Sequence, residues 1–256
     1  MRDVEVVPRK KFVNTIKDKC RPKNSEARCR DANSLEDAAK FGCVEKTRQI
    51  LARSGIDSRG PAPSRALEVA LRSDHVEVVQ LLLSAGAPVN PVTDFDLQTP
   101  PFQAGFGDHL EILQLLIKNG VKVDHKNSDG ETFLSTFGFF NDDIALELLK
   151  AGANPNARDQ HGATALMHAS AYGFESVVQV LLQNGADVHL TDYKGRTALM
   201  YAAEGVDRQY YVDAIPLLRA NGADLNRRDN DGKTALDIAT ELEHKYAIEL
   251  LSADRR

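Results

Sequence analysis

A repeat of about 33 residues constrains this chain more than any other feature of its sequence. Threonines recur at intervals of 33, 32, 33 and 37 residues, at Thr99, Thr132, Thr164, Thr197 and Thr234. Glycines recur at intervals of 34, 32, 33 and 37 residues, at Gly86, Gly120, Gly152, Gly185 and Gly222. A fixed period of roughly 20 to 50 residues is typical of proteins built from stacked units. We therefore expect the chain to fold as a series of similar repeats.

Each repeat has the same internal order, which predicts two antiparallel helices. A turn dipeptide such as Lys194-Gly195 precedes the threonine, and a short Ala-rich helix, a polar break, a second helix and the glycine follow. The threonine is expected to cap the first helix, and the glycine to end the second with the positive φ of a C-cap. Small residues should let the first helices approach closely, at Ala169, Ala202, Ala203 and Ala239. No repeat alone can bury its apolar stripe, so stability must come from stacking.

The pattern resembles the ankyrin repeat, and residues 160–192 (QHGATALMHASAYGFESVVQVLLQNGADVHLTD) are its clearest copy. The resemblance extends from about residue 33 to residue 252. It implies an all-α fold, an ankyrin-repeat solenoid of stacked helix-turn-helix units with β-hairpin tips. We expect about seven repeats including caps, starting near Asn33, Pro63, Asp94, Asn127, Asp159, Asp192 and Asp229.

Two of these repeats depart from the pattern but should still form helix pairs. Arg65 stands where threonine is usual, and Asp74 and Asp108 stand where glycine is usual. Below, each repeat is named by its expected first residue.

The first 30 residues lie outside the repeats and differ from them in charge. They hold 10 Lys/Arg and 4 Asp/Glu, net +6, so the rest of the chain, with 22 basic and 33 acidic residues, has net −11. We expect residues 1–30 to be a basic leader or capping segment and residues 31–256 to be the repeat domain. An acidic body argues against a nucleic-acid-binding surface.

The cysteines and the apolar runs bear on compartment. Cys20, Cys29 and Cys43 show no zinc-ligand spacing, so no metal site is expected and a reducing, cytoplasmic compartment is the default. If the protein is exported or periplasmic after removal of a signal, a Cys20–Cys29 disulfide is open, with Cys43 as a small buried residue. The apolar runs are far shorter than the roughly 20 residues of a membrane span, so no membrane insertion is expected.

Motifs for catalysis are missing from the sequence. It contains no Walker loop, no Gly-x-Ser-x-Gly elbow and no His-Glu-x-x-His. His75, His109 and His244 share one repeat position, at which histidine is expected to bond the adjacent loop. We therefore predict no catalytic residues, no cofactor and no enzymatic activity.

Aromatic residues crowd into one region of the chain, where seven of the ten phenylalanines lie between residues 95 and 140. The resemblance implies a concave binding face lined by the hairpin tips and the ends of the first helices. Candidate partner-binding residues on it are Phe95, Phe106, Phe139, Phe140, His161, Tyr172 and Tyr193. Exposed aromatics are common hot spots of interfaces. The alternative is a core role, in which Phe102, Phe133 and Phe137 point into the stack and Gly105 and Gly138 make room for them.

Two further departures add candidate residues. The repeat from Thr197 to Thr234 is about four residues longer than the others, with the excess at residues 205–211, where Arg208, Tyr210 and Tyr211 are of types favoured at interfaces. Loops also tolerate insertions at little cost, which is the alternative explanation.

The expected hairpin tips carry basic residues, at Lys126, Arg158, Lys194, Arg227 and Arg228, of which we count Arg158 as a site candidate. Such a row fits an acidic partner, but also a mixed, solvated edge.

The sequence thus favours a non-enzymatic module that binds a partner protein on its concave face, as an inhibitor, an immunity-type antidote or an adaptor. The chain is expected to be monomeric on its own. The alternative is a scaffold that associates with copies of itself, and an enzyme is the least favoured reading.

Overall fold

The computed structural model describes residues 25–53, 60–90, 110–127, 129–138, 141–205 and 214–253. The chain separates into two compact parts, residues 1–88 and residues 89–256. The regular elements of the described residues are helices. Two isolated antiparallel β-bridges also occur there, from Lys126 to Thr132 and from Thr191 to Thr197. These bridges close two of the expected hairpin tips.

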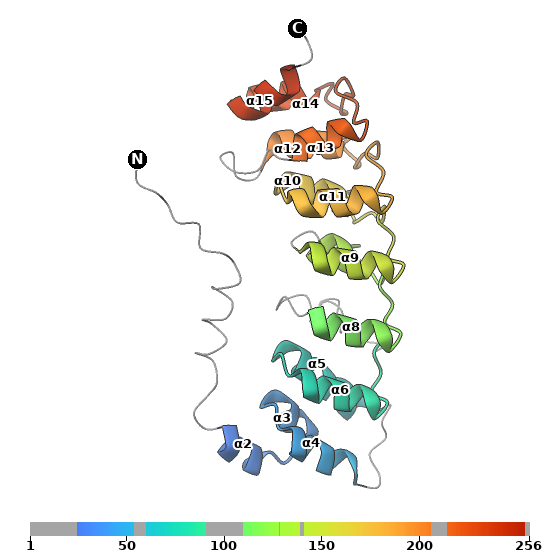
Figure 1. Cartoon of the computed structure of the whole chain (residues 1–256), viewed down its shortest axis with the longest axis vertical. Coiled ribbons are helices and arrows are strands. Elements are labelled where there is room, and N and C mark those ends of the chain that lie inside the picture. Colours follow the sequence, from blue (N-terminus) through green and yellow to red (C-terminus); the bar gives the residue numbers. More distant parts are fainter. Residues whose placement is uncertain are drawn as a thin grey trace, which may run out of the picture. The chain divides into compact units, whose positions relative to one another are not determined.

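The first part contains two stacked helix pairs (Figure 1). Its helices are α2 (Ser25–Asp31), α3 (Leu35–Lys40), α4 (Val44–Leu51), α5 (Pro61–Arg72) and α6 (Val76–Ser84). Helix α3 packs against α5, and α4 packs against α6. The expected helix pair of the Pro63 repeat therefore forms, although Asp74 must adopt a φ of 57° in place of a glycine.

A disulfide joins Cys29 in α2 to Cys43, the N-cap residue of α4, with the two Cα atoms 5.4 Å apart. The Cys20–Cys29 pairing that the sequence left open is wrong, and so is the expectation of an unpaired Cys43. The pairing depends on where α2 lies against the first repeat, which the spacing of cysteines along the chain does not reveal.

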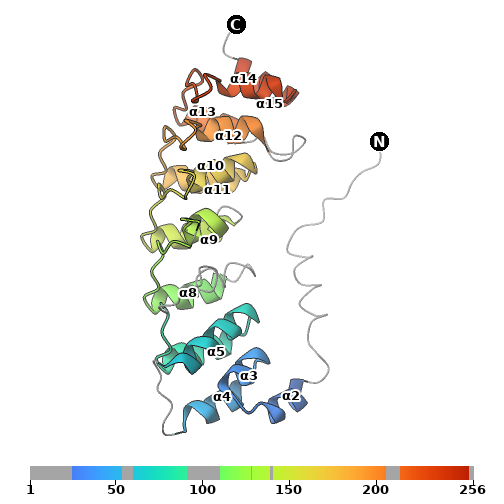
Figure 2. The ribbon, with the colours of Figure 1, turned by 180° about the vertical axis from the view of Figure 1, so that it is seen from behind.

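The second part contains the remaining helices, which form two layers (Figure 2). They are α8 (Leu110–Lys118), the π-helix η1 (Leu134–Gly138), α9 (Asp142–Lys150), α10 (Ala165–Ala171), α11 (Glu175–Gln183), α12 (Ala198–Glu204), α13 (Ala214–Ala220), α14 (Ala235–Glu241) and α15 (Lys245–Ser252). In one layer η1, α10, α12 and α14 pack in succession, and in the other α8, α9, α11, α13 and α15 do so. The all-α prediction is confirmed.

Small residues bring the helices of the first layer together, as expected. The four alanines Ala169, Ala202, Ala203 and Ala239 are each 0% exposed. Larger apolar side chains fill the space between the two layers, among them Leu148, Val178, Leu181, Ile215 and Leu218. Burial of such side chains supplies most of the stabilisation that one repeat gives the next.

The cap predictions are largely confirmed. The expected glycines have φ between 80° and 91°, at Gly86, Gly120, Gly152, Gly185 and Gly222. The hydroxyl oxygens of Thr197 and Thr234 accept hydrogen bonds from the third N–H of α12 and α14. Thr164 stands at the N-cap of α10, but its side chain makes no capping bond there.

The core alternative is confirmed for one phenylalanine. Phe133 is 1% exposed and lies in the core. Gly138 lies close to two leucines, since a Cβ there would lie 2.7 Å from Leu134 Cδ1 and 3.6 Å from Leu148 Cδ1. Leucines therefore fill the space beside Gly138. Phe102, Gly105 and the side chain of Phe137 lie outside the described residues.

Glu243 adopts a φ of 55° where the Asp159 repeat has Gly173, with a φ of 64°. Because left-handed backbone costs an L-residue roughly 1–2 kcal/mol, and glycine returns part of that through its unfolded-state entropy, Glu243→Gly should stabilise the protein by about 0.5–1 kcal/mol. Urea unfolding measures this change. The control Glu249→Gly, inside α15, should instead destabilise by about 1 kcal/mol. Equal losses in both variants would contradict the assignment of strain to Glu243.

Candidate functional site

Each of four successive hairpins begins with an Asp or Asn that braces its own turn. One side-chain oxygen accepts hydrogen bonds from the N–H groups two and four residues later. In the Asp159 repeat these bonds run from His161 N and Ala163 N to Oδ1, both 2.8 Å. The same pair of bonds recurs, at 2.8–3.0 Å, at Asn127, Asp192 and Asp229. The tips are therefore held rigidly by the backbone and by one Asp or Asn side chain each.

The second carboxylate oxygen has side-chain partners in the Asp159 and Asp192 repeats, and these partners differ. Asp159 Oδ2 lies 3.0 Å from His168 Nε2. Asp192 Oδ2 accepts from Tyr201 Oη at 2.9 Å and from Arg196 Nε at 3.0 Å. In the described part of the chain, Asp229 has no such side-chain donor, because Ile238 stands where the other repeats have His168 and Tyr201.

Arg196 connects these groups into one network. Its guanidinium donates to Glu204 Oε2 at 3.0 Å and to Tyr201 Oη at 2.9 Å, and it lies 4.5 Å from the centre of the Tyr201 ring. The His168 ring meets the Tyr201 ring edge to face, with centroids 6.5 Å apart. Polar contacts and ring contacts thus join the Asp159 and Asp192 repeats beside their tips.

The charges of this network follow from its bonds. Burial alone would raise the pKa of Asp159, but hydrogen bonds from His168, Ala163 N and His161 N outweigh it and lower the pKa. The ionised carboxylate therefore stabilises the fold at neutral pH, and this contribution is lost as the pH falls through the lowered pKa. Burial, and next its hydrogen bond to Asp192, raise the pKa of Tyr201, which keeps the phenol protonated as a donor.

The network forms the floor of a cavity of about 290 Å³, here called the tip pocket. Its lining is Asp159, His161, Ala163, His168, Asp192, Tyr193, Lys194, Arg196 and Tyr201. The carboxylates of the floor are almost fully buried, with side-chain exposures of 3% for Asp159 and 2% for Asp192. The rim consists of three exposed side chains from two hairpin tips, His161, Tyr193 and Lys194.

Tyr193 is unusual among the residues of its repeat position. Neighbouring repeats have amides there, which donate to the preceding hairpin, Gln160 Nε2 to Asp129 Oδ1 at 3.2 Å and Asn230 Nδ2 to Tyr193 O at 3.0 Å. Tyr193 instead lays its ring over Gly162, where a Cβ would lie 2.7 Å from Tyr193 Cδ1. The side chain remains 66% exposed. The ring of Tyr193 is thus held against Gly162 on one side, and the rest of the side chain is exposed at the rim of the pocket.

The other predicted site residues have varied positions. Tyr172 ends α10, is half-buried and stacks on Phe174 with ring centroids 6.1 Å apart. Arg158 donates to Thr191 O at 2.6 Å and to Gly162 O at 3.4 Å, so it braces successive hairpins. The remaining candidates lie outside the described residues, namely Phe95, Phe106, Phe139, Phe140, Arg208, Tyr210 and Tyr211.

The expected row of tip cations is partly used inside the protein. Lys126 Nζ donates to Arg158 O at 2.8 Å, and Arg228 donates to Gly232 O and lies 3.7 Å from Asp237 Oδ2. Lys194 differs, because its ammonium is exposed and makes no hydrogen bond or ion pair with the described residues. Lys194 is therefore a tip cation that faces outward beside the pocket.

Sequence reasoning missed the floor of the pocket. His168 and Tyr201 each stand nine residues after the bracing aspartate, where the next repeat has Ile238. Alignment of the repeats on that aspartate shows this departure. The histidines at the other shared position behave as expected, since His75 Nε2 lies 3.2 Å from Lys40 O and His244 Nδ1 lies 3.2 Å from Ala203 O. His109 lies outside the described residues.

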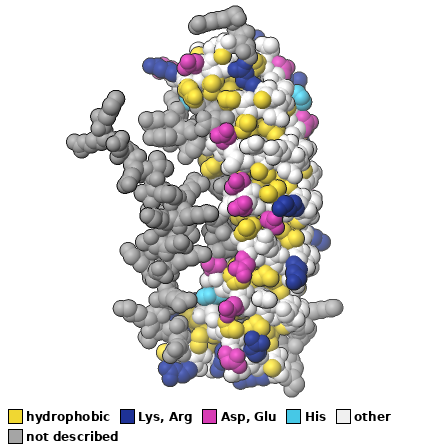
Figure 3. Space-filling model, viewed as in Figure 1, with side chains coloured by type: hydrophobic (Ala, Val, Ile, Leu, Met, Phe, Trp, Pro, Cys, Tyr) yellow, Lys and Arg dark blue, Asp and Glu magenta, His cyan; other side chains and the backbone are white. Residues whose placement is uncertain are grey.

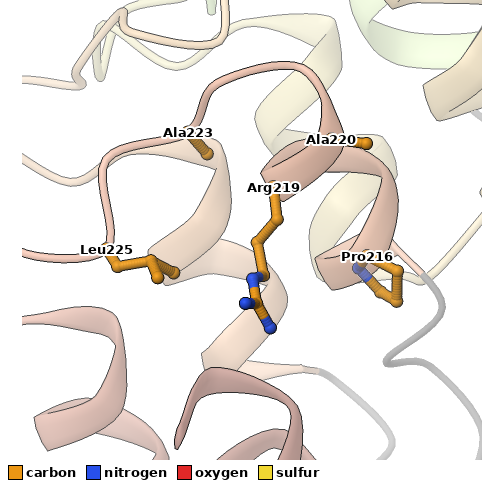
Figure 4. A pocket seen from close by; sticks show the side chains of 5 residues that line it. All are labelled: Pro216, Arg219, Ala220, Ala223 and Leu225. Carbon is orange, nitrogen blue, oxygen red and sulfur yellow. The ribbon is translucent and has the colours of Figure 1, made fainter. Parts of the chain in front are cut away.

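A second cavity, of about 430 Å³, lies beside α13 (Figure 4). Its lining is Pro216, Arg219, Ala220, Ala223 and Leu225. Arg219 donates to the carbonyl oxygen of Leu250 in α15, so its guanidinium joins the last two repeats. The rest of the lining offers no polar side chain to a ligand, and we assign this cavity a packing role.

Other classes of site were sought in the same residues. Within the described ranges, no group of three or more His, Cys, Asp or Glu side chains could hold a metal ion. No helix there has the length and apolar character that crossing a bilayer requires. On the face that Figure 3 shows, acidic side chains are spread over successive repeats with basic ones scattered among them.

The comparison with known families agrees with the repeat and the fold. A family model described as ankyrin repeats (3 copies) matches residues 67–159, 102–192, 135–229 and 190–255. These matches overlap and together extend from residue 67 to residue 255. The chain therefore belongs to the ankyrin-repeat family, whose members are in general non-enzymatic protein–protein interaction modules.

Proposed function

We propose that this chain binds a partner protein through the surface formed by the tips of the Asp159 and Asp192 repeats and the adjoining ends of α10 and α12. The observation that carries the proposal is the exposed ring of Tyr193 at the rim of the tip pocket. Tyrosine is among the residue types that contribute most to binding energy when a partner covers them. Ankyrin-repeat membership supports a protein as the partner.

Rigidity of the tips supports the same proposal. Successive hairpins are joined by backbone hydrogen bonds, from Gln160 N to Asp129 O at 2.8 Å, from Tyr193 N to His161 O at 3.0 Å and from Asn230 N to Lys194 O at 2.9 Å. A surface held in this way loses little conformational entropy on association, so more of the contact energy appears as affinity.

A rigid binding surface of this kind can act by covering part of the partner protein. A standard interface buries about 1,600 Å² in total, which is enough to cover the working surface of a partner. We propose that the chain, monomeric by itself, acts as an inhibitor, an antidote or an adaptor through such coverage.

Affinity capture from the native organism, with mass spectrometry, tests the proposal. We expect the double variant His161→Ala/Tyr193→Ala to lose a partner that the wild-type protein retains. Tyr246→Ala is the matched control, because Tyr246 is also exposed, at 51%, but lies on α15 away from the pocket lining. Equal recovery by all three proteins would refute this site.

Light scattering on the purified protein separates the proposal from self-association. A monomer at high concentration is the expected result. A dimer or larger assembly that His161→Ala/Tyr193→Ala dissociates would instead favour the scaffold.

A further inference from the structure

We infer that the tip pocket receives an acidic side chain, Asp or Glu, from the partner protein. The inference rests on the proposed function and names the chemistry that the partner brings to this surface. It follows from the size of the pocket, from the hydrogen bonds that its lining has already made and from the charges of the neighbouring tips.

The size of the pocket suits one side chain. Its volume of about 290 Å³ is at or below the lower end of the roughly 300–1,000 Å³ that small-molecule sites occupy. The rim is formed by two adjacent tips, so a side chain projecting from a partner surface can enter between them.

The acceptors on the floor are already occupied by donors of the chain itself. Both oxygens of Asp192 accept two hydrogen bonds each, from Lys194 N and Arg196 N and from Arg196 Nε and Tyr201 Oη. Asp159 accepts two backbone bonds at Oδ1 and contacts His168 at Oδ2. A visiting cation would therefore have to displace these donors from buried carboxylates.

The polar groups still available are donors. A guanidinium has five N–H groups, and Arg196 uses one each on Nε and its two terminal nitrogens, which leaves two for a partner. The exposed Lys194 ammonium and His161 ring on the rim form no side-chain bond with the described residues. The Lys194 ammonium and the two remaining Arg196 N–H groups are cationic donors, and these fit a carboxylate, with which they form charge-assisted hydrogen bonds.

The neighbouring tips set the register of the acidic group. At the positions of His161 and Lys194, the adjoining repeats have Asp129 and Asp231. A carboxylate placed one repeat away would meet a like charge, and repulsion of that kind is how interfaces exclude wrong alignments. Of these four successive tips, the Asp159 and Asp192 tips are thus the two that lack a carboxylate at this position and can receive an acidic side chain.

Selection from a phage-displayed library of random 12-residue peptides tests the inference. We expect the wild-type protein to enrich peptides containing Asp or Glu beside an apolar residue. Lys194→Glu should lose this enrichment and select Lys or Arg. Lys122→Glu is the control, because it makes the same charge change at an exposed lysine outside the pocket, and it should select as the wild type does.

Binding of a synthetic peptide from the selection then measures how much its acidic side chain contributes to affinity. Replacement of its acidic residue by the amide, Glu to Gln or Asp to Asn, should raise Kd about tenfold for the wild-type protein and by a smaller factor for Lys194→Ala, in which Arg196 is the remaining cationic donor. Thermal unfolding of each variant confirms that the fold is kept, as expected for an exposed side chain.

The outcomes that overturn the inference are distinct from those that overturn the proposed function. Selection of no peptides, or of peptides without acidic residues, or of the same acidic peptides by Lys194→Glu, would remove the inference. A natural partner lost by His161→Ala/Tyr193→Ala but kept by Lys194→Glu would preserve the proposed function and remove the acidic contact.

Discussion

Asp192→Ala is expected to lower the free energy of unfolding by about 3–5 kcal/mol, the usual result of removing one member of a buried ion pair. The Asp192 side chain is 2% exposed and accepts four hydrogen bonds, two from backbone N–H groups, one from Tyr201 and one from Arg196. Its removal leaves these donors unpaired, and among the described residues Arg196 keeps Glu204 as its charged partner. Urea unfolding measures the loss.

Asp229→Ala is the matched control for this change. Asp229 makes the same two backbone bonds, from Asp231 N and Lys233 N, but has no side-chain donor among the described residues. We expect a loss of about 1–2 kcal/mol there, the penalty for backbone donors left partly unpaired. If both variants lost the same stability, the network around Arg196 would contribute nothing beyond the brace. Faster hydrogen exchange at the Lys194 and Arg196 amides of Asp192→Ala should locate the damage at the hairpin.

Gly130→Ala should destabilise the protein by about 3 kcal/mol, from roughly 1–2 kcal/mol for a left-handed alanine and the rest from a steric clash. Gly130 has a φ of 72°, and a Cβ there would lie 2.9 Å from Gln160 N and 3.3 Å from Asp159 C. Both atoms belong to the backbone of the next hairpin, so they cannot move aside as a side chain would. The hydrogen bond from Gln160 N to Asp129 O would be strained by the same displacement.

Gly120→Ala separates the two contributions. Gly120 has a similar φ of 80°, but a Cβ there meets no atom within 4 Å in the described part of the chain. We expect it to lose only the backbone cost of about 1–2 kcal/mol. Thermal or urea unfolding of the two variants, compared side by side, gives the steric contribution as a difference. Equal losses would show that the hairpins can separate without cost.

The predictions from sequence succeeded where one repeat contains all the atoms concerned. Helix pairs and the glycine at the end of each second helix follow from local periodicity and backbone preference, which repeat along the chain. The start of α9 is equally local, because Asp142 and Asp143 follow the Asn141 cap and suit the dipole of their own helix.

The candidate site was only partly predictable from the sequence. Tyr193, His161 and Arg158 were identified as tip residues, but their different uses were not, because these depend on which atoms of the adjacent hairpin each side chain reaches. Arg158 is engaged by Thr191 O, whereas Tyr193 covers a glycine and keeps a free face. His168, Arg196 and Tyr201 were missed because ordinary helix or turn positions carry them.

The sequence by itself therefore determined the repeat, the ankyrin family and the helices, since a period and its caps are local properties of the chain. Only the tertiary structure decided the Cys29–Cys43 disulfide, the leucines beside Gly138 and the tip pocket. Each of these depends on side chains brought together by packing from different turns or repeats. Contacts of that kind are set by the distance and orientation between packed elements, which no local pattern of residues encodes.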